Sequence, residues 1–124
     1  MIFSELFIHN PRILAVPAGQ CLFREGEAGG QMYVLSIGSA KLTVNGSVIE
    51  TLGHGSVVGE MGLVASGLRT AAVVATEDCE FVEIDEQRFL FLVQQTPSFA
   101  LQIMRLMADR WCAADQRLPA NACV

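Results

Sequence analysis

The sequence has little positive charge. Its 124 residues include 8 Lys and Arg against 13 Asp and Glu, which gives a formal net charge of −5 at pH 7. Nucleic acid binding relies on clustered Lys and Arg, and an acidic surface repels a phosphate backbone. We therefore expect no direct nucleic acid binding. A small anion can still bind, because one desolvated arginine in a pocket matters more locally than the net charge does.

Cysteine and histidine are too few and too scattered for a metal centre or a disulfide framework. The four cysteines are far apart: Cys21, Cys79, Cys112 and Cys123. They form no Cys-x-x-Cys pair, so we interpret them as reduced thiols of a cytoplasmic protein. Of the two histidines, His9 and His54, the second lies in a Gly-His-Gly-Ser loop and is expected to be solvated. A jelly-roll metalloenzyme, which would gather several His and carboxylates on facing strands, is the alternative that metal analysis would test.

Long apolar runs and catalytic motifs are absent as well. No run approaches the roughly 18 residues that a membrane helix needs, and the start, MIFSELFIHNPR, has no basic segment before a long apolar stretch. We expect no membrane segment and no export. The sequence also has no Gly-x-Ser-x-Gly elbow, no Walker-type glycine loop and no His-Glu-x-x-His motif. We therefore expect neither catalysis nor a cofactor.

The residues that are present indicate a β-rich domain. Hydrophobic residues make up 52% of the chain and charged residues 17%, which is a globular profile. Short runs of β-branched and aromatic residues alternate with glycine-bearing turns. About eight strands at this spacing favour an antiparallel double-sheet jelly roll, and we expect a single domain over residues 1–124 with its roll over about 12–84. Asn45-Gly46 predicts a hairpin turn, because a type I′ turn needs positive φ at both central residues. The candidate strands are residues 13–16, 21–23, 31–38, 40–45, 47–52, 70–76 and 80–84.

Two helices are predicted after the last strand. Asp85 is a suitable N-cap, and residues 86–95 have helical spacing of apolar side chains ahead of Pro97. Thr96 can cap a second helix over residues 97–116, with Pro97 at its first position. The fold expected is therefore a β-roll followed by two C-terminal helices.

The stretch GEMGLVASGLRT, residues 59–70, holds the candidate binding site. Residues 60–65 can form one or two helical turns, and Ser66-Gly67 can end them because Gly tolerates the left-handed conformation. The first turn of a helix leaves backbone N–H groups unpaired, and these groups attract anions. We therefore expect a short helix beside the ligand.

Two charged residues frame this stretch. Arg69 offers a planar fork that can pair with two phosphate oxygens, and Gly59 and Gly62 let a ligand approach the backbone closely. Glu60 would repel a phosphate, so in a pocket it must accept a hydrogen bond from a hydroxyl. A sugar phosphate offers both groups. The alternative, on spacing alone, is that Glu60 and Arg69 form a salt bridge or lie solvated at the surface.

Four stretches, in this order and spacing, carry a family resemblance: PAGQCLFREGEAGGQMYVLSIG, LGHGSVVGEMGLV, LRTAAVVATEDCEFVEID and RFLFLVQQTP. From about Val16 to Arg110 the sequence resembles the cyclic nucleotide-binding domain family, which includes the bacterial catabolite activator, protein kinase A regulatory subunits and nucleotide-gated channels. The family's phosphate-binding cassette runs roughly Gly-Glu-apolar-Ala-Leu, a variable piece, then Pro-Arg-Ser/Thr-Ala. The positions that match it are Gly59, Glu60, Met61, Leu63, Arg69, Thr70 and Ala71.

The resemblance implies a role for most of these positions. Glu60 would accept a hydrogen bond from the ribose 2′-hydroxyl, and Arg69 would pair with the cyclic phosphate. Backbone N–H groups around Met61 and Ala71 would bind phosphate oxygens, and Thr70 would reach the phosphate or the base edge. The ligand implied is a 3′,5′-cyclic nucleotide. We favour cAMP over cGMP, although Thr70 is compatible with either.

The last helix supplies a further candidate contact. Arg110 and Trp111 would form a lid over the purine, as residues of the C-terminal helix do in parts of the family. The alternative is that Trp111 is buried against the roll or in a dimer seam.

The sequence departs from the family pattern at three places. Gly62 stands where Ala is usual, Leu68 where Pro is common, and Val57-Val58 where an aromatic residue often precedes the Gly-Glu pair. The first two changes loosen the cassette, because glycine adds backbone entropy and the loss of proline frees φ. We expect these departures to lower affinity more than to change the class of ligand.

The resulting hypothesis is a cytoplasmic regulatory sensor that binds a cyclic nucleotide and signals through its two C-terminal helices. Only WCAADQRLPANACV follows residue 110, which is too short for a helix-turn-helix domain. We therefore expect the chain to act on a partner in trans, through a homodimer along its last helix, or as part of a longer protein. The alternative is a protein-interaction module of the same fold with a degenerate pocket that binds no nucleotide.

Overall fold

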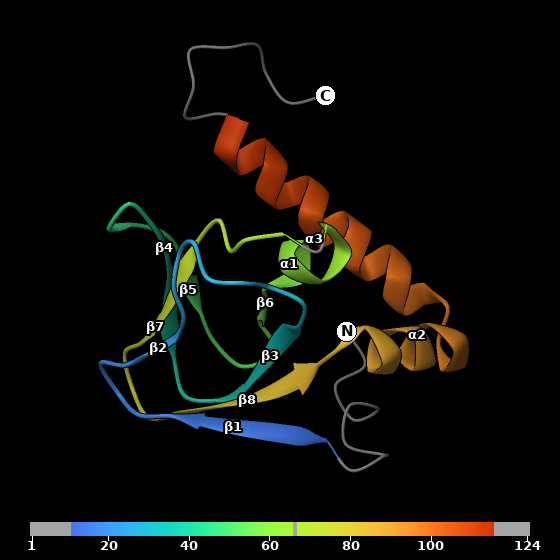
Figure 1. The fold of residues 1–124 in the computed structure, drawn as a ribbon, viewed down its shortest axis with the longest axis horizontal. Coiled ribbons are helices and arrows are strands. Elements are labelled where there is room, and N and C mark those ends of the chain that lie inside the picture. The colour runs from blue at the N-terminus through green and yellow to red at the C-terminus, as the bar shows by residue number, and fades with distance from the viewer. Residues whose placement is uncertain (1–10, 66, 116–124) are drawn as a thin grey trace.

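The fold is described from a computed structural model, which describes residues 11–65 and 67–115, with side chains as far as residue 110. Eight antiparallel strands form two four-stranded sheets, and three helices lie on one side of them (Figure 1). The first sheet has the strand order β1-β8-β3-β6. Its strands are β1 (Arg12–Val16), β8 (Cys79–Ile84), β3 (Met32–Ile37) and β6 (Val57–Val58).

The second sheet has the strand order β2-β7-β4-β5. The turn between its last two strands has the expected geometry, because Asn45 and Gly46 both adopt positive φ, at 51° and 79°. This turn places Val44 opposite Ser47 in an antiparallel hairpin. The strands are β2 (Cys21–Phe23), β7 (Ala72–Ala75), β4 (Ala40–Val44) and β5 (Ser47–Leu52).

Alternation along β3 divides the buried side chains between two cores. Tyr33 and Leu35 point into the space between the sheets, where they pack with residues such as Phe81. Met32 and Val34 point to the opposite face of the same sheet and pack under the helices. Because a strand presents successive side chains to opposite faces, a strand buried on both faces has an almost unbroken apolar run. This explains the sequence MYVLSI.

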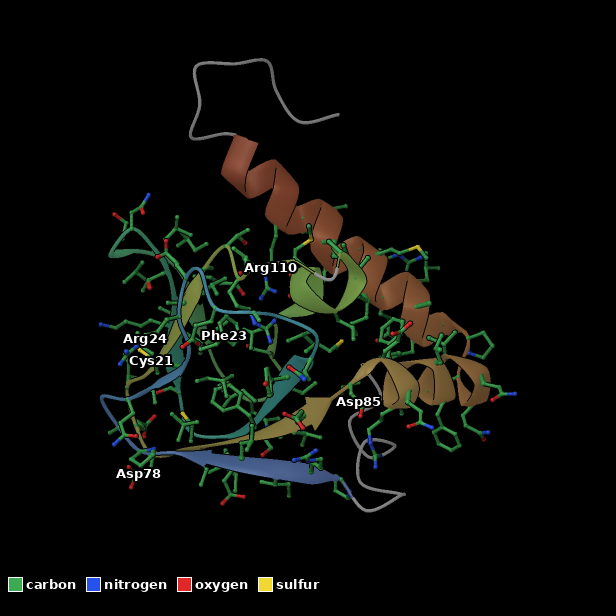
Figure 2. The ribbon with its side chains drawn as sticks, in the orientation of Figure 1. Cys21, Phe23, Arg24, Asp78, Asp85 and Arg110 are labelled. Carbon is green, nitrogen blue, oxygen red and sulfur yellow. The ribbon has the colours of Figure 1, made fainter. Side chains whose placement is uncertain are left out.

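The helices cover the outer face of the first sheet. They are α1 (Glu60–Ala65), α2 (Glu86–Gln95) and α3 (Ser98–Asp115). Asp85 caps α2 as expected, since its side chain accepts a hydrogen bond of 2.8 Å from the Arg88 N–H. Phe99 and Ile103 of α3 pack with Leu92 of α2 in the outer core. Figure 1 shows α1 between the roll and α3, and Figure 2 places Asp85 where β8 passes into α2.

The structure confirms the expected fold class, a mainly β roll with a short helix and two C-terminal helices. It differs from the sequence interpretation in detail. Strand β6 has only two residues and had no recognisable pattern. The helix α1 ends at Ala65, and Ser66, half of the pair expected to end it, lies outside the described residues. Among the described residues, no helix combines the length and apolar character needed to cross a membrane.

Candidate functional site

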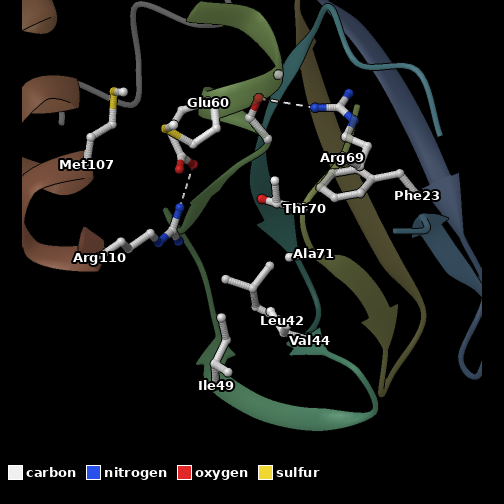
Figure 3. Close-up of a pocket in the computed structure, with 13 residues that line it drawn as sticks. Phe23, Leu42, Val44, Ile49, Glu60, Arg69, Thr70, Ala71, Met107 and Arg110 are labelled. Carbon is white, nitrogen blue, oxygen red and sulfur yellow. Dashed lines mark hydrogen bonds and ion pairs between the residues drawn. The ribbon is translucent and has the colours of Figure 1, made fainter. Parts of the chain in front are cut away.

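A pocket of about 350 Å³ opens between the roll, α1 and the middle of α3. This volume lies at the lower end of the range of small-molecule sites, which is about 300–1,000 Å³. Figure 3 shows Arg69 and Phe23 on one side of the pocket, Glu60 and Arg110 on the other, and Thr70 between them. The seven candidate ligand-binding residues line it: Gly59, Glu60, Met61, Gly62, Arg69, Thr70 and Ala71. Leu63, which also matches the cassette pattern, packs in the outer core instead.

Backbone hydrogen bonds hold Arg69 in place. Its N–H donates to the Glu27 carbonyl at 2.7 Å, and its own carbonyl accepts from the Gly26 N–H at 2.9 Å. The loop between β2 and β3 therefore runs alongside the cassette and fixes where the arginine side chain begins. An isolated bridge between Ala28 and Leu68 continues this pairing.

The guanidinium of Arg69 is buried without a balancing acid. The residue is 6% exposed, and its Cζ lies 4.3 Å from the ring centroid of Phe23. Nη1 donates to the Gly59 carbonyl at 3.1 Å. Within the described residues, Nε has no hydrogen-bond acceptor and no carboxylate lies within ion-pair distance of the side chain. A buried cation without a counter-charge is costly, so this side chain is poised for an anion.

Glu60 faces a different arginine. The carboxylate is almost fully buried, and its Oε1 accepts a hydrogen bond of 2.5 Å from Nη1 of Arg110. Arg110 also makes a bidentate contact with Glu50 on β5, through Nε at 3.1 Å and Nη2 at 3.2 Å. One guanidinium therefore connects α3, α1 and the second sheet. The alternative of a Glu60–Arg69 salt bridge is wrong, because packing of α3 brings Arg110 to the acid instead.

The other residues singled out in the sequence lie as follows. Tyr33, within the expected strand of residues 31–38, is part of the inner core. Exposed His54 is bonded through Nδ1 to the Ser36 carbonyl at 2.8 Å, and the described residues contain no cluster of His, Cys, Asp and Glu that could bind a metal. Met107 packs against the outer core and also lines the pocket beside Arg110. Trp111 belongs to α3, but its side chain lies outside the described residues.

Several residues in or beside the pocket were not identified from the sequence. Glu50, which does not line the pocket but pairs with Arg110, had no local signal, because a charged residue on a half-exposed strand is ordinarily solvated. Phe23 was assigned only to a strand, although Figure 2 shows it inside the roll and Figure 3 shows it against Arg69. The remaining members form an apolar wall on the strands of the second sheet: Leu42, Val44 and Ile49. Alternation along β4 and β5 could have suggested that these side chains face inward, but not that they face a cavity.

The pKa of Tyr33 depends on the positive charge of Arg69. The Arg69 Cζ lies 5.8 Å from the Tyr33 ring centroid, and the Tyr33 hydroxyl donates to Oε1 of Glu83 at 3.4 Å. Burial raises the pKa of Tyr33 above its usual value, and the Glu83 carboxylate raises it further. Arg69 acts in the opposite direction and lowers this pKa, because a nearby positive charge favours the tyrosinate.

Arg69→Ala is therefore expected to raise the pKa of Tyr33. Tyr33 is the only tyrosine in the chain, so its ionisation can be followed directly by the ultraviolet absorbance of tyrosinate during an alkaline titration. Arg105→Ala is the matched control, since Arg105 is exposed on α3. A folded Arg69→Ala protein whose Tyr33 titrates as in the wild type would contradict the arrangement of these two side chains.

Known proteins share this fold and this sequence pattern. A sequence profile described as the cyclic nucleotide-binding domain matches residues 13–96. The chain is 34% identical over 107 residues to a cyclic AMP receptor protein of Thermus thermophilus, covering 82% of this chain and 50% of that protein. The chain therefore spans about half the length of this curated relative, and less of several others.

Solved structures agree with the sequence comparison. A catabolite activator protein of Thermus thermophilus matches with a TM-score of 0.80 and 29% identity, over 92% of this chain and 56% of that one. A structure reported for a cyclic-GMP-dependent signalling pathway in bacterial phytopathogenesis matches with a TM-score of 0.74 and 31% identity, over 89% and 93% of the two chains. This chain belongs to the cyclic nucleotide-binding domain family.

Proposed function

We propose that the pocket binds a 3′,5′-cyclic nucleotide, with cAMP favoured over cGMP, and that its occupancy is passed to a partner through the C-terminal helices. The observation that carries this proposal is Arg69, a buried guanidinium on the pocket wall with no carboxylate to balance it among the described residues. An arginine fork binds phosphate oxygens with geometric specificity. A cyclic phosphate would supply the missing negative charge.

The rest of the pocket suits the rest of the nucleotide. Glu60 lies across the pocket from Arg69, with Thr70 between them (Figure 3). Arg110 occupies Oε1 of Glu60, but a carboxylate can accept several hydrogen bonds, so a ribose 2′-hydroxyl can still bind there. The apolar wall of Leu42, Val44 and Ile49 offers a surface for the purine.

The preference for cAMP rests on relatives rather than on geometry. The relative with 34% identity is described as a cyclic AMP receptor protein, whereas the structure with 31% identity comes from a cyclic-GMP-dependent pathway. Thr70 lines the pocket and can bond to either purine. We favour cAMP because the first of these relatives is the more similar in sequence.

The proposal that α3 carries the signal is supported by its position, because one part of this helix lines the pocket and another part is exposed. Met107 and Arg110 line the pocket, whereas Leu101 and Met104 of the same helix are exposed. A ligand shifts a conformational equilibrium only if it binds one arrangement better than the other, and contacts with Arg110 would supply that difference. The exposed apolar side chains of α3 support a partner in trans or a homodimer along this helix.

One observation favours the alternative of a non-binding interaction module. Arg110 pairs with Glu60, so the acid proposed to recognise ribose already has a partner within the protein. If this pair holds too strongly, Glu60 does not accept the ribose hydroxyl and the fold serves only for protein contacts.

Calorimetric titration with cAMP, cGMP and 5′-AMP tests the proposal. Binding of one cyclic form well above 5′-AMP, whose phosphate ring is open, would support the sensor and identify the purine. Absence of binding by both cyclic nucleotides would reject it in favour of the interaction module.

Glu60→Ala is expected to reduce discrimination against a 2′-deoxy analogue. In the wild type the hydroxyl would donate to Glu60, so its absence leaves a buried carboxylate with one hydrogen bond fewer. Without the carboxylate, cAMP and 2′-deoxy-cAMP should bind with similar affinity. Arg105→Ala should keep the wild-type discrimination, and an unchanged ratio in folded Glu60→Ala would place the ribose elsewhere.

A further inference from the structure

The space occupied by the Arg69 guanidinium exists because the surrounding residues are glycines. A Cβ on Gly62 would collide with Nη1 of Arg69 and lie 3.2 Å from its Cζ. A Cβ on Gly59 would lie 2.8 Å from Nη1, and one on Gly29 would lie 3.5 Å from Cζ. The guanidinium therefore lies against the backbone at Gly59 and Gly62, where a side chain would displace it, and in ordinary contact with the backbone at Gly29.

Of the three glycines, Gly62 is the one where a side chain would mainly displace Arg69, although its Cβ would also lie 3.3 Å from the Gly29 Cα, a tight contact. Gly59 has φ of +78°, so a side chain there would be strained whatever the space. A Cβ on Gly29 would meet the Gly67 carbonyl at 2.8 Å and the Gly62 Cα at 2.9 Å, both parts of the backbone. Gly62 lies within α1, where alanine is favourable, and its closest neighbour is the flexible end of Arg69.

The contacts of Arg69 in this position compete with phosphate binding. Nη1 donates to the Gly59 carbonyl, the guanidinium stacks on Phe23, and only 6% of the residue is exposed. A bidentate contact with a phosphate needs two N–H groups directed into the pocket. A phosphate that pairs with Nη1 has to replace its contact with the Gly59 carbonyl, and a guanidinium that moves toward the pocket gives up part of its stacking on Phe23.

We propose that Gly62 sets the nucleotide affinity of this pocket, because its missing side chain lets Arg69 be held against α1. This inference rests on the proposed function and assigns Gly62 as a positioning residue that acts through Arg69. A methyl group on residue 62 would prevent the Arg69 guanidinium from lying against α1. The guanidinium would then be directed toward the phosphate.

Gly62→Ala is expected to bind cAMP about three- to tenfold more tightly than the wild type, the effect of one hydrogen bond that no longer has to be lost. Gly67→Ala is the matched control. It also replaces a glycine of the cassette, but among the described residues its Cβ would meet only the Ala65 carbonyl, at 4.0 Å. It should therefore leave the affinity unchanged. Equal or weaker binding by a folded Gly62→Ala protein would overturn the proposal.

A double-mutant comparison separates this effect from simple stabilisation of α1. If Gly62 acts through Arg69, the gain should vanish when Arg69 is also replaced by Ala. If alanine merely stiffens the helix, the gain should persist in the Arg69→Ala protein, and the proposal would be wrong.

Titration of Tyr33 tests the movement of Arg69 without any nucleotide. Arg69 lowers the pKa of Tyr33 from its held position, so Gly62→Ala should raise that pKa while Gly67→Ala leaves it unchanged. An unchanged pKa in Gly62→Ala would overturn the inference. Because this readout needs no ligand, it judges the position of Arg69 even if calorimetry rejects the proposed function.

Discussion

Arg69→Ala is expected to weaken cyclic nucleotide binding by about 10- to 100-fold, and this is the largest effect on function that we predict. A charge-assisted hydrogen bond contributes roughly 1.5 to 3 kcal/mol, and each 1.4 kcal/mol is a factor of about ten in affinity. The fold should persist, because the variant removes a buried cation that has no carboxylate partner in the described part of the chain. Calorimetry with cAMP and thermal unfolding measure the two properties separately.

Two further variants sharpen this experiment. Arg69→Lys keeps the charge but loses the planar fork, so it should bind more weakly than the wild type and more tightly than Arg69→Ala. Arg69→Met keeps apolar packing against Phe23 and serves if the alanine variant unfolds. Unchanged affinity in a folded Arg69→Ala protein would exclude the proposed contact with phosphate.

Arg110→Ala is expected to destabilise the protein by about 3 kcal/mol. Removing one partner of a buried ion pair leaves the other charge uncompensated, which typically costs about 3 to 5 kcal/mol. The side chain of Glu60 is 5% exposed and would be left in this state, whereas that of Glu50 is 38% exposed and can be solvated. We therefore expect the lower end of the range. Denaturant unfolding in the absence of nucleotide measures the loss.

A second substitution identifies the origin of this loss. Adding Glu60→Gln to Arg110→Ala removes the uncompensated charge, so it should restore part of the stability. Arg105→Ala, an exposed charge on the same helix, should leave stability within about 0.5 kcal/mol of the wild type. If Glu60→Gln lowers the stability of the Arg110→Ala protein further, the ion pair is not what holds α3 against the cassette.

Arg69 and Arg110 have different functions in the proposed sensor. Arg69 offers charge to a ligand, whereas Arg110 connects the ligand-facing Glu60 to the helix that would carry the signal. A nucleotide that weakens the Glu60–Arg110 contact would change how α3 is held, and the coupling is reciprocal. A partner that moves α3 would then change nucleotide affinity by the same factor.

The sequence predicted the elements whose signals are local. The Asn45-Gly46 turn needs only two residues that tolerate positive φ, and the Asp85 cap needs only a short acceptor before a helical period. The apolar run of β3 also indicated a strand, although only the structure shows that its two faces serve different cores. A strand as short as β6 has no period to detect.

What the sequence determined by itself was the order of the strands and helices other than β6, and the presence of Glu60 and Arg69 within one short cassette. Only the tertiary structure decided how these charges are used. Sequence spacing made a Glu60–Arg69 pair conceivable, but Arg110 reaches Glu60 from 50 residues away, and Glu50 joins from β5. Pairings of this kind depend on how α3 packs across the roll, and no period or propensity of a few neighbouring residues specifies that packing. The same holds for Gly62, whose role follows from the arginine that occupies the space beside it.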